Sequence, residues 1–504
     1  MPAESRDVAA RLFPALFGDT RDSFWLDSSR PDPRLGRLSI LGTADGPMGN
    51  VFWHHVADTA SPSPAPEGFY PELRCRLAET ARPIYSHDGG GAHPALPGGF
   101  SPGLVCALGY GLGMDGRGQG AGAGGEPPPP RHPAQPQQPD ALPDAMLAVP
   151  SRLVIIDQFT GEVALLSAGD ESAQPESLAR AWLDDAARIV AELARGKGEP
   201  GGDGNGGDGN GDYEPEADRA ERSTGEFVLD ASRAEYLEAI ARCQDAIGLG
   251  EAYEICLTNT ARGPRIEDPL GAYQRLRRHT PAPFGAYLRF GDTALLCASP
   301  ERFLRVDPCG AMETRPIKGT RPRGADADSD RALHEDLASN DKDRAENLMI
   351  VDLLRNDLGR VSALGSVGVP QLCEVESFSH VHQLVSTITG RLEPGRDLVD
   401  AIAATFPGGS MTGAPKRRAM DLCARIEPRA RGLYSGALGW LAPDGSADLA
   451  ITIRTAVTGP RGTSIGVGGA ILAPSDPEAE WAETLVKLRP VLDALGARLA
   501  EDRT

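Results

Sequence analysis

The chain has 504 residues, of which 40% are hydrophobic, and a formal net charge of -20 at pH 7. This length exceeds what a single hydrophobic core usually supports, so we expect two domains or one composite fold. The negative charge argues against nucleic acid or an anionic membrane as the main partner, and no apolar stretch approaches the roughly 18 residues that a membrane span needs.

The cysteines and histidines indicate a protein of a reducing compartment, and they do not predict a zinc site. The 8 cysteines are scattered without a CxxC pair, which is typical of reduced thiols rather than of a disulfide framework. The 9 histidines form no zinc-like cluster. Because the first residues also lack the unbroken apolar core of a signal peptide, we expect a cytoplasmic protein.

Short strand-like segments separated by turn residues dominate the first part of the chain. They lie at 24–26, 103–109, 152–157 and 162–166, and a helix is expected over 175–195. Two further segments, 112–145 and 196–223, are rich in Gly and in Pro, Gln, Asn or Asp. They predict unfolded chain, because they hold too little apolar surface to offset the entropy of ordering. We interpret the first as an inserted loop and the second as a boundary between two regions.

Helical and strand patterns alternate after this boundary. Helices are predicted over 232–248 and 331–357, and strands at 254–258, 294–298, 435–440, 449–455 and 463–468. The last helix is expected to start at Asp476-Pro477, where an N-cap residue precedes a proline at the first helical position.

Lysine is rare in this chain, and Lys318 is one of only 5 lysines among 51 basic residues. Arginine stays protonated, whereas a lysine that is buried or crowded by cations can lose its proton and act as a nucleophile. Its sequence neighbours Arg315, Arg321 and Arg323 are expected to supply that crowding. The alternative is a solvated lysine in a turn, which is the common case for a lysine taken at random.

The run Gly408-Gly-Ser-Met-Thr-Gly-Ala-Pro-Lys416 is a glycine-rich turn that leads into a helix. Glycines let backbone N–H groups approach a ligand, and a helix N-terminus favours anions. The spacing is not that of a phosphate-binding P-loop, so a carboxylate is a simpler ligand than a nucleotide. Taken alone, such a turn is more often only a helix cap.

Three helical carboxylates are candidate metal ligands. Glu346 lies in a predicted helix, and Glu480 and Glu483 share one face of the last helix with Lys487. Carboxylates that converge from two helices suit Mg2+, which needs few protein ligands. From spacing alone, Glu483 and Lys487 are better explained as a surface pair worth about 0.2–0.5 kcal/mol.

Two further residues are candidates for substrate contact. Arg454 lies in a predicted strand, where a buried guanidinium needs an anionic partner from the fold or from a substrate. Tyr434 is a candidate hydrogen-bond donor, and equally a candidate core residue.

Five blocks of the second half occur together. They are Ser299-Pro-Glu-Arg-Phe-Leu304, Arg315-Pro-Ile-Lys-Gly-Thr-Arg-Pro-Arg323, Arg344-Ala-Glu-Asn-Leu-Met-Ile-Val-Asp-Leu-Leu-Arg-Asn-Asp-Leu-Gly-Arg360, Phe406-Pro-Gly-Gly-Ser-Met-Thr-Gly-Ala-Pro-Lys416 and Ser475-Asp-Pro-Glu-Ala-Glu-Trp-Ala-Glu-Thr-Leu-Val-Lys487. The set resembles the chorismate-utilising enzymes, which include anthranilate, aminodeoxychorismate, isochorismate and salicylate synthases. Phe24-Trp-Leu-Asp-Ser-Ser29 resembles the N-terminal part of the amino-transferring members more weakly.

The resemblance implies an α+β class, the composite chorismate-utilising-enzyme fold, in which two antiparallel β-sheets pack as a sandwich flanked by helices. It divides the chain into three parts. These are an anthranilate-synthase-I-like region at 1–170 that contains the insert 112–145, a helix and low-complexity linker at 171–229, and a chorismate-binding catalytic domain at 230–500.

The resemblance also implies a reaction. Anthranilate synthases typically carry alanine where Lys318 stands, so this chain looks like the aminodeoxychorismate synthase branch. The implied catalytic steps are attack of Lys318 on C2 of chorismate, protonation of the departing C4 hydroxyl by Glu301, and addition of ammonia at C4 with expulsion of the lysine. The implied Mg2+ ligands are Glu346 and Glu483. The implied contacts to the substrate are Arg454, Tyr434, Thr412, Gly413, Gly468 and Lys487.

The ammonia source is expected to be a separate glutamine amidotransferase subunit, because the sequence contains no glutaminase-like cysteine setting. The chain departs from the family pattern at Gln383, where histidine is frequent and His382 precedes it, and at Ala470, a usual glycine. Glu254 stands near the lysine base of the water-using relatives and argues against isochorismate formation. Anthranilate synthase component I is the alternative enzyme, and a catalytically inactive binding subunit is the alternative class.

Overall fold

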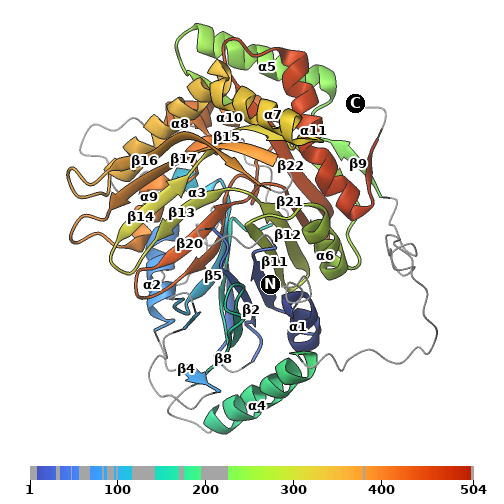
Figure 1. Cartoon of the computed structure of the whole chain (residues 1–504), viewed down its shortest axis with the longest axis vertical. Helices are drawn as coiled ribbons and strands as arrows, with labels where there is room; N and C mark the ends of the chain where they lie inside the picture. Colours follow the sequence, from blue (N-terminus) through green and yellow to red (C-terminus); the bar gives the residue numbers. More distant parts are fainter. Residues whose placement is uncertain are drawn as a thin grey trace.

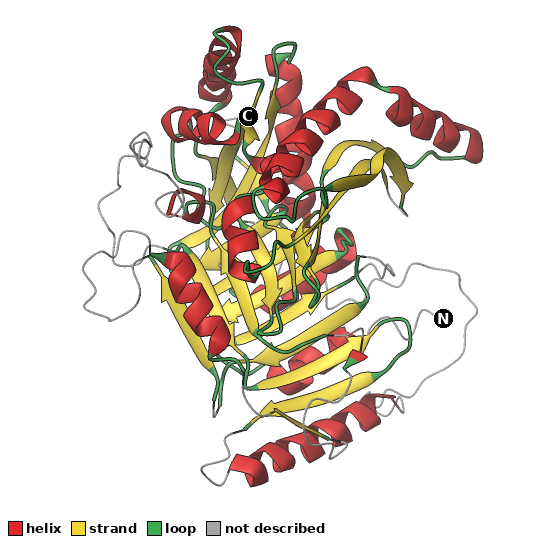
Figure 2. Cartoon of the chain, turned by 90° about the vertical axis from the view of Figure 1, so that its left-hand side faces the viewer, coloured by secondary structure: helices red, strands yellow, loops and turns green. Residues whose placement is uncertain are grey.

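Two β-sheets pack face to face, and helices cover their outer faces (Figure 1, Figure 2). The computed structural model describes residues 8–29, 35–46, 48–55, 68–81, 84–87, 96–97, 100–115, 142–169, 175–194, 225–378 and 381–500. The expected α+β sandwich is therefore confirmed.

The larger sheet draws strands from both ends of the chain. Its strands are β1 (Ser23–Asp27), β2 (Leu38–Thr43), β4 (Ile84–Ser86), β7 (Arg152–Asp157), β8 (Val163–Ala168), β9 (Glu226–Leu229), β10 (Glu254–Gly263), β11 (Phe284–Phe290), β12 (Thr293–Ser299), β18 (Gly413–Ala414), β21 (Thr455–Gly459), β22 (Gly462–Ile471) and β23 (Arg498–Leu499). Their order is β23-β9-β10-β22-β21-β12-β11-β1-β2-β7-β8-β4, with β18 on the edge of β10. The central β1–β11 ladder joins the N-terminal strands to the C-terminal ones.

The smaller sheet has the same mixed origin. Its strands are β3 (Asn50–His54), β5 (Leu104–Leu108), β6 (Ala145–Val149), β13 (Arg302–Val306), β14 (Ala311–Arg315), β15 (Ile317–Pro322), β16 (Gly368–Ser377), β17 (Val381–Arg391), β19 (Ala437–Leu441) and β20 (Ala447–Ile451). They follow the order β15-β17-β14-β13-β20-β19-β5-β6-β3, with β16 beside β17. The N-terminal region and the proposed catalytic domain thus share both sheets.

Helices pack on the outer faces of the two sheets. They are α1 (Val8–Phe17), α2 (Phe69–Ala78), α3 (Leu112–Asp115), α4 (Pro175–Ala194), α5 (Arg233–Gly248), α6 (Pro269–His279), α7 (Ala327–Ser339), α8 (Asp341–Gly359), α9 (Leu398–Thr405), the 3-10 turn η5 (Gly409–Met411), α10 (Lys416–Ile426) and α11 (Pro477–Leu495). As predicted, Asp476 caps α11, where its side chain accepts a hydrogen bond from Ala479 N–H.

Three large hydrophobic clusters hold the layers together. The first contains residues of both sheets, such as Phe24, Leu288, Val105 and Leu438, and fills the space between them. The other two lie under the helices of each outer face. Because apolar burial is the main stabilising contribution, this arrangement fixes the strands whose ends form the site.

Three sequence expectations are wrong at their boundaries. The predicted helix 331–357 is two helices, because Asn340 leaves the helical conformation and its side chain caps α8 through Asp343 N–H. The predicted strand 449–455 is also divided, since β20 and β21 belong to different sheets. In the predicted insert 112–145, residues 112–115 form α3, and 116–141 lie outside the described residues.

The predicted low-complexity boundary at 196–223 also lies outside the described residues. The neighbouring helix prediction at 175–195 agrees with α4. Within the described part of the chain, every helix is too short or too polar to span a membrane.

Candidate active site

Lys318 is held between two carboxylates. Its side chain projects from β15, and its Nζ donates to Glu254 Oε1 at 2.9 Å and to Glu346 Oε1 at 2.6 Å. Glu254 begins β10 of the other sheet, and Glu346 lies on α8, so three elements meet at this amine. Figure 1 labels two of them, β15 and α8. Lys318 is only 8% exposed, which excludes the solvated-lysine alternative.

The predicted crowding of Lys318 by arginines is wrong. Each of the three neighbouring arginines pairs with carboxylates elsewhere. Arg315 pairs with Glu376, Arg321 with Asp336 and Asp343, and Arg323 with Asp330. Burial by itself lowers the pKa of Lys318, but Glu254 and Glu346 outweigh it and hold this pKa well above its usual value. The lysine is therefore an ammonium ion in this state of the protein.

Glu301 is a buried carboxyl group whose pKa is raised to about 7, so a large fraction of it is protonated near neutral pH. It lies between β12 and β13 and accepts a hydrogen bond from Ser410 Oγ at 2.7 Å. The backbone N–H of Ile317, the residue before Lys318, also acts on this carboxyl and lowers its pKa. Burial raises the pKa of Glu301 to about 7, although Ser410 and the charge of Lys318 lower it. Such a group can donate a proton near neutral pH.

The two predicted metal ligands lie on facing helices. Glu346 on α8 contacts Lys318, whereas Glu483 on α11 pairs with Lys487 at 2.7 Å. Burial raises the pKa of Glu483, but the positive charges of Lys487, Lys342 and Lys318 outweigh it, so its pKa is lowered. Lys318 thus lies within electrostatic range of both carboxylates.

No group of three or more His, Cys, Asp or Glu side chains is assembled for a metal among the residues that the structure describes. A tight all-protein cage is therefore absent from this part of the chain. The donor set does fit Mg2+, which is commonly held by one or two carboxylates together with waters and ligand oxygens.

Arg454 lies where the chain crosses from β20 to β21, and it adopts a left-handed conformation with φ 49°. Its guanidinium has no ion-pair or hydrogen-bond partner among the described residues. Burial lowers its pKa. The sequence predicts that this arginine pairs with a carboxylate of the fold or with a carboxylate of the substrate. The described residues contain no carboxylate that pairs with it.

The remaining predicted contacts lie on two backbone segments. Thr412 and Gly413 follow η5, and Gly413 has φ 112° and leaves no room for a Cβ, which would lie 2.2 Å from Glu254 O. Gly468 on β22 accepts a hydrogen bond from Lys487 Nζ at 3.2 Å. The Tyr434 ring lies against Gly466 of the same strand, where a Cβ would lie 2.0 Å from its Cγ. Close packing therefore explains why Gly413 and Gly466 are glycines.

Sequence reasoning missed two residues of this site. Ser410, the hydrogen-bond donor to Glu301, was only part of a glycine-rich motif. In the sequence, Glu254 argues only against isochorismate formation, whereas in the structure it binds Lys318 from a position 64 residues earlier in the chain. The spacing of residues along the chain does not predict such a contact, although an acidic residue directly before the apolar residues 255–257 was a signal.

His382, which precedes the position where the family frequently carries histidine, has a structural role. His382 Nδ1 lies 2.8 Å from Ser377 Oγ, and its Nε2 lies 3.0 Å from Asp330 Oδ1, which also pairs with Arg323. This network joins β17 to α7. Gln383 projects from the opposite face of β17, because successive residues of a strand alternate.

Comparisons with known proteins agree with this arrangement. Residues 127–493 match the chorismate binding enzyme family. An aminodeoxychorismate synthase of Streptomyces griseus is 43% identical over 491 residues, which are 96% of this chain and 62% of that protein. The same name is carried by a Streptomyces pristinaespiralis protein that is 42% identical, over 97% of this chain and 63% of its own length. The chain thus spans less than two thirds of these relatives.

Proteins named anthranilate synthase component I are also similar to this chain. An anthranilate synthase component 1 of Streptomyces coelicolor is 36% identical, over 96% of this chain and 85% of its own length. The crystal structure of anthranilate synthase component I from Streptococcus pneumoniae aligns with a TM-score of 0.68 and 26% identity, covering 92% of this chain and 93% of that one.

Proposed function

The chain belongs to the chorismate binding enzymes, and we propose that it converts chorismate and ammonia to 4-amino-4-deoxychorismate and water, as aminodeoxychorismate synthase component I. The single observation that carries this proposal is Lys318, a buried amine held between Glu254 and Glu346 and within electrostatic range of Glu301, a carboxyl group whose pKa is raised to about 7. An amine at this position supplies a nucleophile that an alanine lacks.

The proposed reaction has two halves. Lys318 transfers a proton to Glu254, whose second oxygen has no hydrogen-bond partner among the described residues, and the free amine attacks C2 of chorismate. Glu301 protonates the C4 hydroxyl, which leaves as water. Ammonia then forms the C4–N bond while the C2–N bond to Lys318 breaks. Covalent catalysis thereby divides one difficult displacement into two easier ones.

Glu346 and Glu483 are the proposed ligands of Mg2+, with oxygens of the substrate completing the coordination. When bound, Mg2+ would offset the negative charge of the ring carboxylate and orient it. Arg454 and Tyr434 are proposed to bind the second carboxylate, and Thr412, Gly413, Gly468 and Lys487 to close the pocket around the ring.

Glutamine-derived ammonia from a glutamine amidotransferase subunit is the proposed nitrogen source. The eight cysteines are free, which supports the proposed cytoplasmic location. Neither nucleic acid nor a membrane is a proposed partner.

The product decides between this proposal and anthranilate synthase component I, the name of a relative that matches 96% of the chain. We expect the protein with chorismate, MgCl2 and an ammonium salt to yield 4-amino-4-deoxychorismate, which an added lyase converts to 4-aminobenzoate. Anthranilate and pyruvate without added lyase would support the second candidate. Absence of any chorismate turnover would favour an inactive binding subunit.

Replacement of Arg454 by methionine is expected to weaken substrate binding while stabilising the fold. A partly buried guanidinium without a partner costs free energy, and methionine removes that cost. The substrate carboxylate loses a charged hydrogen bond worth about 1.5–3 kcal/mol, so we expect KM for chorismate to rise at least about tenfold. Steady-state kinetics and thermal unfolding measure the two effects. A lower melting temperature together with an unchanged KM would contradict the proposed role.

A further inference from the structure

Arg431 is a buried charged residue close to the site that the proposed reaction does not use. It follows α10, and its side chain is only 2% exposed. Its guanidinium binds the carboxylate of Glu427, the C-cap residue of α10, with Nη2 at 2.6 Å and Nε at 3.0 Å from the two oxygens. The pair is therefore bidentate, which is the strongest geometry for an arginine and a carboxylate.

The same guanidinium holds two backbone carbonyls that belong to different elements. Its Nη1 donates to Met411 O at 2.7 Å, and its Nη2 donates to Cys256 O at 2.6 Å. Met411 ends the η5 turn, and Cys256 lies on β10. Arg431 thus joins the turn to the strand.

Both joined segments carry residues of the site. Ser410 lies in η5 and donates to Glu301 at 2.7 Å. Glu254 begins β10 and accepts a hydrogen bond from Lys318 at 2.9 Å. The Arg431 contacts therefore fix the hydrogen-bond donor of Glu301 relative to the strand that carries a partner of the amine.

The η5 turn needs an external partner to be rigid. It is a single 3-10 turn, and the neighbouring glycines Gly408 and Gly409 leave its backbone conformationally free. A carbonyl at the end of a helical turn has no partner inside the turn. Arg431 supplies that partner for Met411.

Stability alone does not account for a buried ion pair at this place. Taking two charges out of water costs free energy that their attraction often only balances, and apolar residues of similar volume can be as stable. Glu427 is itself fixed, because it accepts from the backbone N–H and the hydroxyl of Thr258 at 3.0 Å and 2.9 Å. An apolar pair cannot hold two carbonyls in place, whereas a planar guanidinium with five N–H donors can.

We propose that Arg431 is a positioning residue that holds η5 against β10 and so keeps Ser410 within hydrogen-bonding distance of Glu301. Glu427 anchors its guanidinium. The proposal rests on the proposed function, in which Glu301 is the proton donor.

The surroundings of Glu301 connect this role to the pH profile. Burial raises the pKa of Glu301, and the hydrogen bond from Ser410 lowers it. The groups that face it from β15 and α11 also lower it, and they are Lys318, the backbone N–H of Ile317, and Lys487. If η5 moves away, the contribution of Ser410 is lost and the pKa of Glu301 rises further. Activity that needs protonated Glu301 then extends to higher pH.

Two variants remove the contacts of Arg431 and are designed to keep the fold. Arg431→Met combined with Glu427→Gln removes both charges together, because Arg431→Met alone would leave a buried carboxylate unpaired. Arg431→Lys keeps a charge beside Glu427 but loses the planar fork that reaches two carbonyls. With chorismate, MgCl2 and ammonium chloride, we expect both proteins to show a kcat about 10- to 100-fold below that of the wild type.

Ser410→Ala tests whether Arg431 acts through Ser410. We expect Ser410→Ala to move the basic limb of the kcat pH profile to higher pH, and the Arg431→Met, Glu427→Gln protein to move it by the same amount. Combining all three substitutions should move it no further, since they remove one and the same hydrogen bond to Glu301. An ion pair that only stabilises the fold would leave the limb at its wild-type position.

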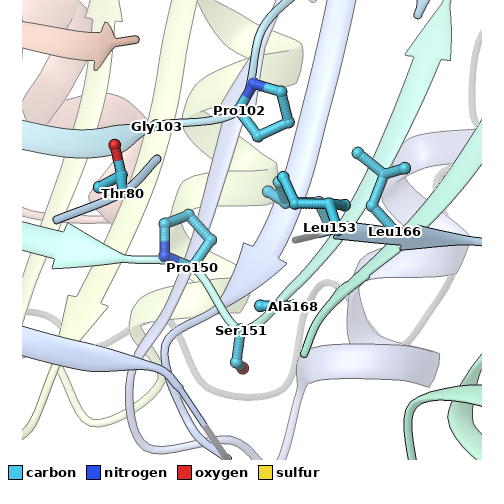
Figure 3. A pocket seen from close by; sticks show the side chains of 9 residues that line it. Thr80, Pro102, Gly103, Pro150, Ser151, Leu153, Leu166 and Ala168 are labelled. Carbon is cyan, nitrogen blue, oxygen red and sulfur yellow. The ribbon is translucent and has the colours of Figure 1, made fainter. Parts of the chain in front are cut away.

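Two matched controls lie away from the site. Arg277 and Asp27 form another buried ion pair at 2.6 Å, which Arg277→Met combined with Asp27→Asn removes in the same way. Ser151, whose hydroxyl donates to Thr43 O, lines a cleft among N-terminal strands (Figure 3). The residues described in that lining include no titratable side chain. We expect the paired variant and Ser151→Ala to lower the melting temperature without changing kcat or the basic limb.

The outcomes separate this role from the proposed function. If a folded Arg431 variant keeps the wild-type kcat and basic limb, the positioning role is wrong, although the wild type still aminates chorismate. An equal change in the Arg277 and Asp27 control would also refute it, because the effect would then follow from lost stability.

If the wild type forms no aminated product, the proposed function falls, and the pH dependence of stability still tests the Arg431 contacts. The free energy of unfolding is then compared with that of the same protein carrying Glu301→Gln. A raised folded-state pKa of Glu301 means that its contribution is lost up to a higher pH in the Arg431→Met, Glu427→Gln protein than in the wild type. An unchanged pH range would overturn the proposal.

Discussion

Replacing Lys318 by methionine is expected to lower the rate of amination by at least about 10³-fold at a fixed ammonia concentration, as is common when a covalent nucleophile is removed. Methionine fills a similar volume but has no lone pair that can attack C2. The measurement is product formation by chromatography, with thermal unfolding in parallel, since Glu254 and Glu346 lose their shared cation.

Lys318→Arg is the matched control for this loss of charge. The guanidinium keeps a positive charge between Glu254 and Glu346, so the fold should be retained, but it stays protonated and cannot be the nucleophile. We expect a folded protein that forms neither product nor a covalent adduct with chorismate. Wild-type turnover by the arginine variant would refute the role of Lys318.

Glu301→Gln is expected to reduce amination by about 10²–10⁴-fold, the usual contribution of a positioned general acid. Glutamine keeps the size of the side chain and a hydrogen bond to Ser410, but it cannot protonate the departing hydroxyl. The pH profile of the wild type gives an independent measurement. Because the pKa of Glu301 is about 7, activity should fall as the pH rises through this value. A flat profile between pH 6 and about 8.5 would contradict an essential protonated Glu301.

The same substitution should change the pH dependence of stability. The pKa of Glu301 rises from the ordinary 4.5 to about 7 on folding, so the folded protein binds the extra proton in this window. The contribution of Glu301 to stability therefore decreases as the pH rises from about 4.5 to 7, by about 3 kcal/mol in total, and stays constant above. The Glu301→Gln variant does not lose stability in this way as the pH rises, so it should be more stable than the wild type above pH 7. Denaturant unfolding at pH 5 and pH 8 tests the difference.

Local signals predicted much of the fold. The N-cap and proline at Asp476-Pro477 placed the start of α11, and apolar runs placed β1, β7 and α5 within one or two residues. These features depend on neighbours in the sequence, since caps and strand alternation act over a few residues. The break at Asn340 was missed, because the apolar period continues on both sides of it while a single side chain ends the helix.

Arg454 was misplaced for a different physical reason. The apolar run around it continues from β20 into β21, so the sequence predicts one strand there. Only the tertiary structure decides that the two halves join different sheets, with Arg454 at the crossing. A change of sheet depends on which distant strands are available for pairing, and the pattern of one segment does not contain that information.

By itself, the sequence determined the family of this protein and most candidate site residues, because the five blocks carry the chemistry in side-chain identity and order. The tertiary structure decided the charge state of the site's side chains, above all that of Lys318. Arg315, Arg321 and Arg323 adjoin Lys318 in the sequence but pair with their own carboxylates, whereas Glu254 and Glu346 reach Lys318 from other elements. The pKa of a buried group depends on the charges that surround it in space, and strand alternation directs sequence neighbours to opposite faces of the sheet.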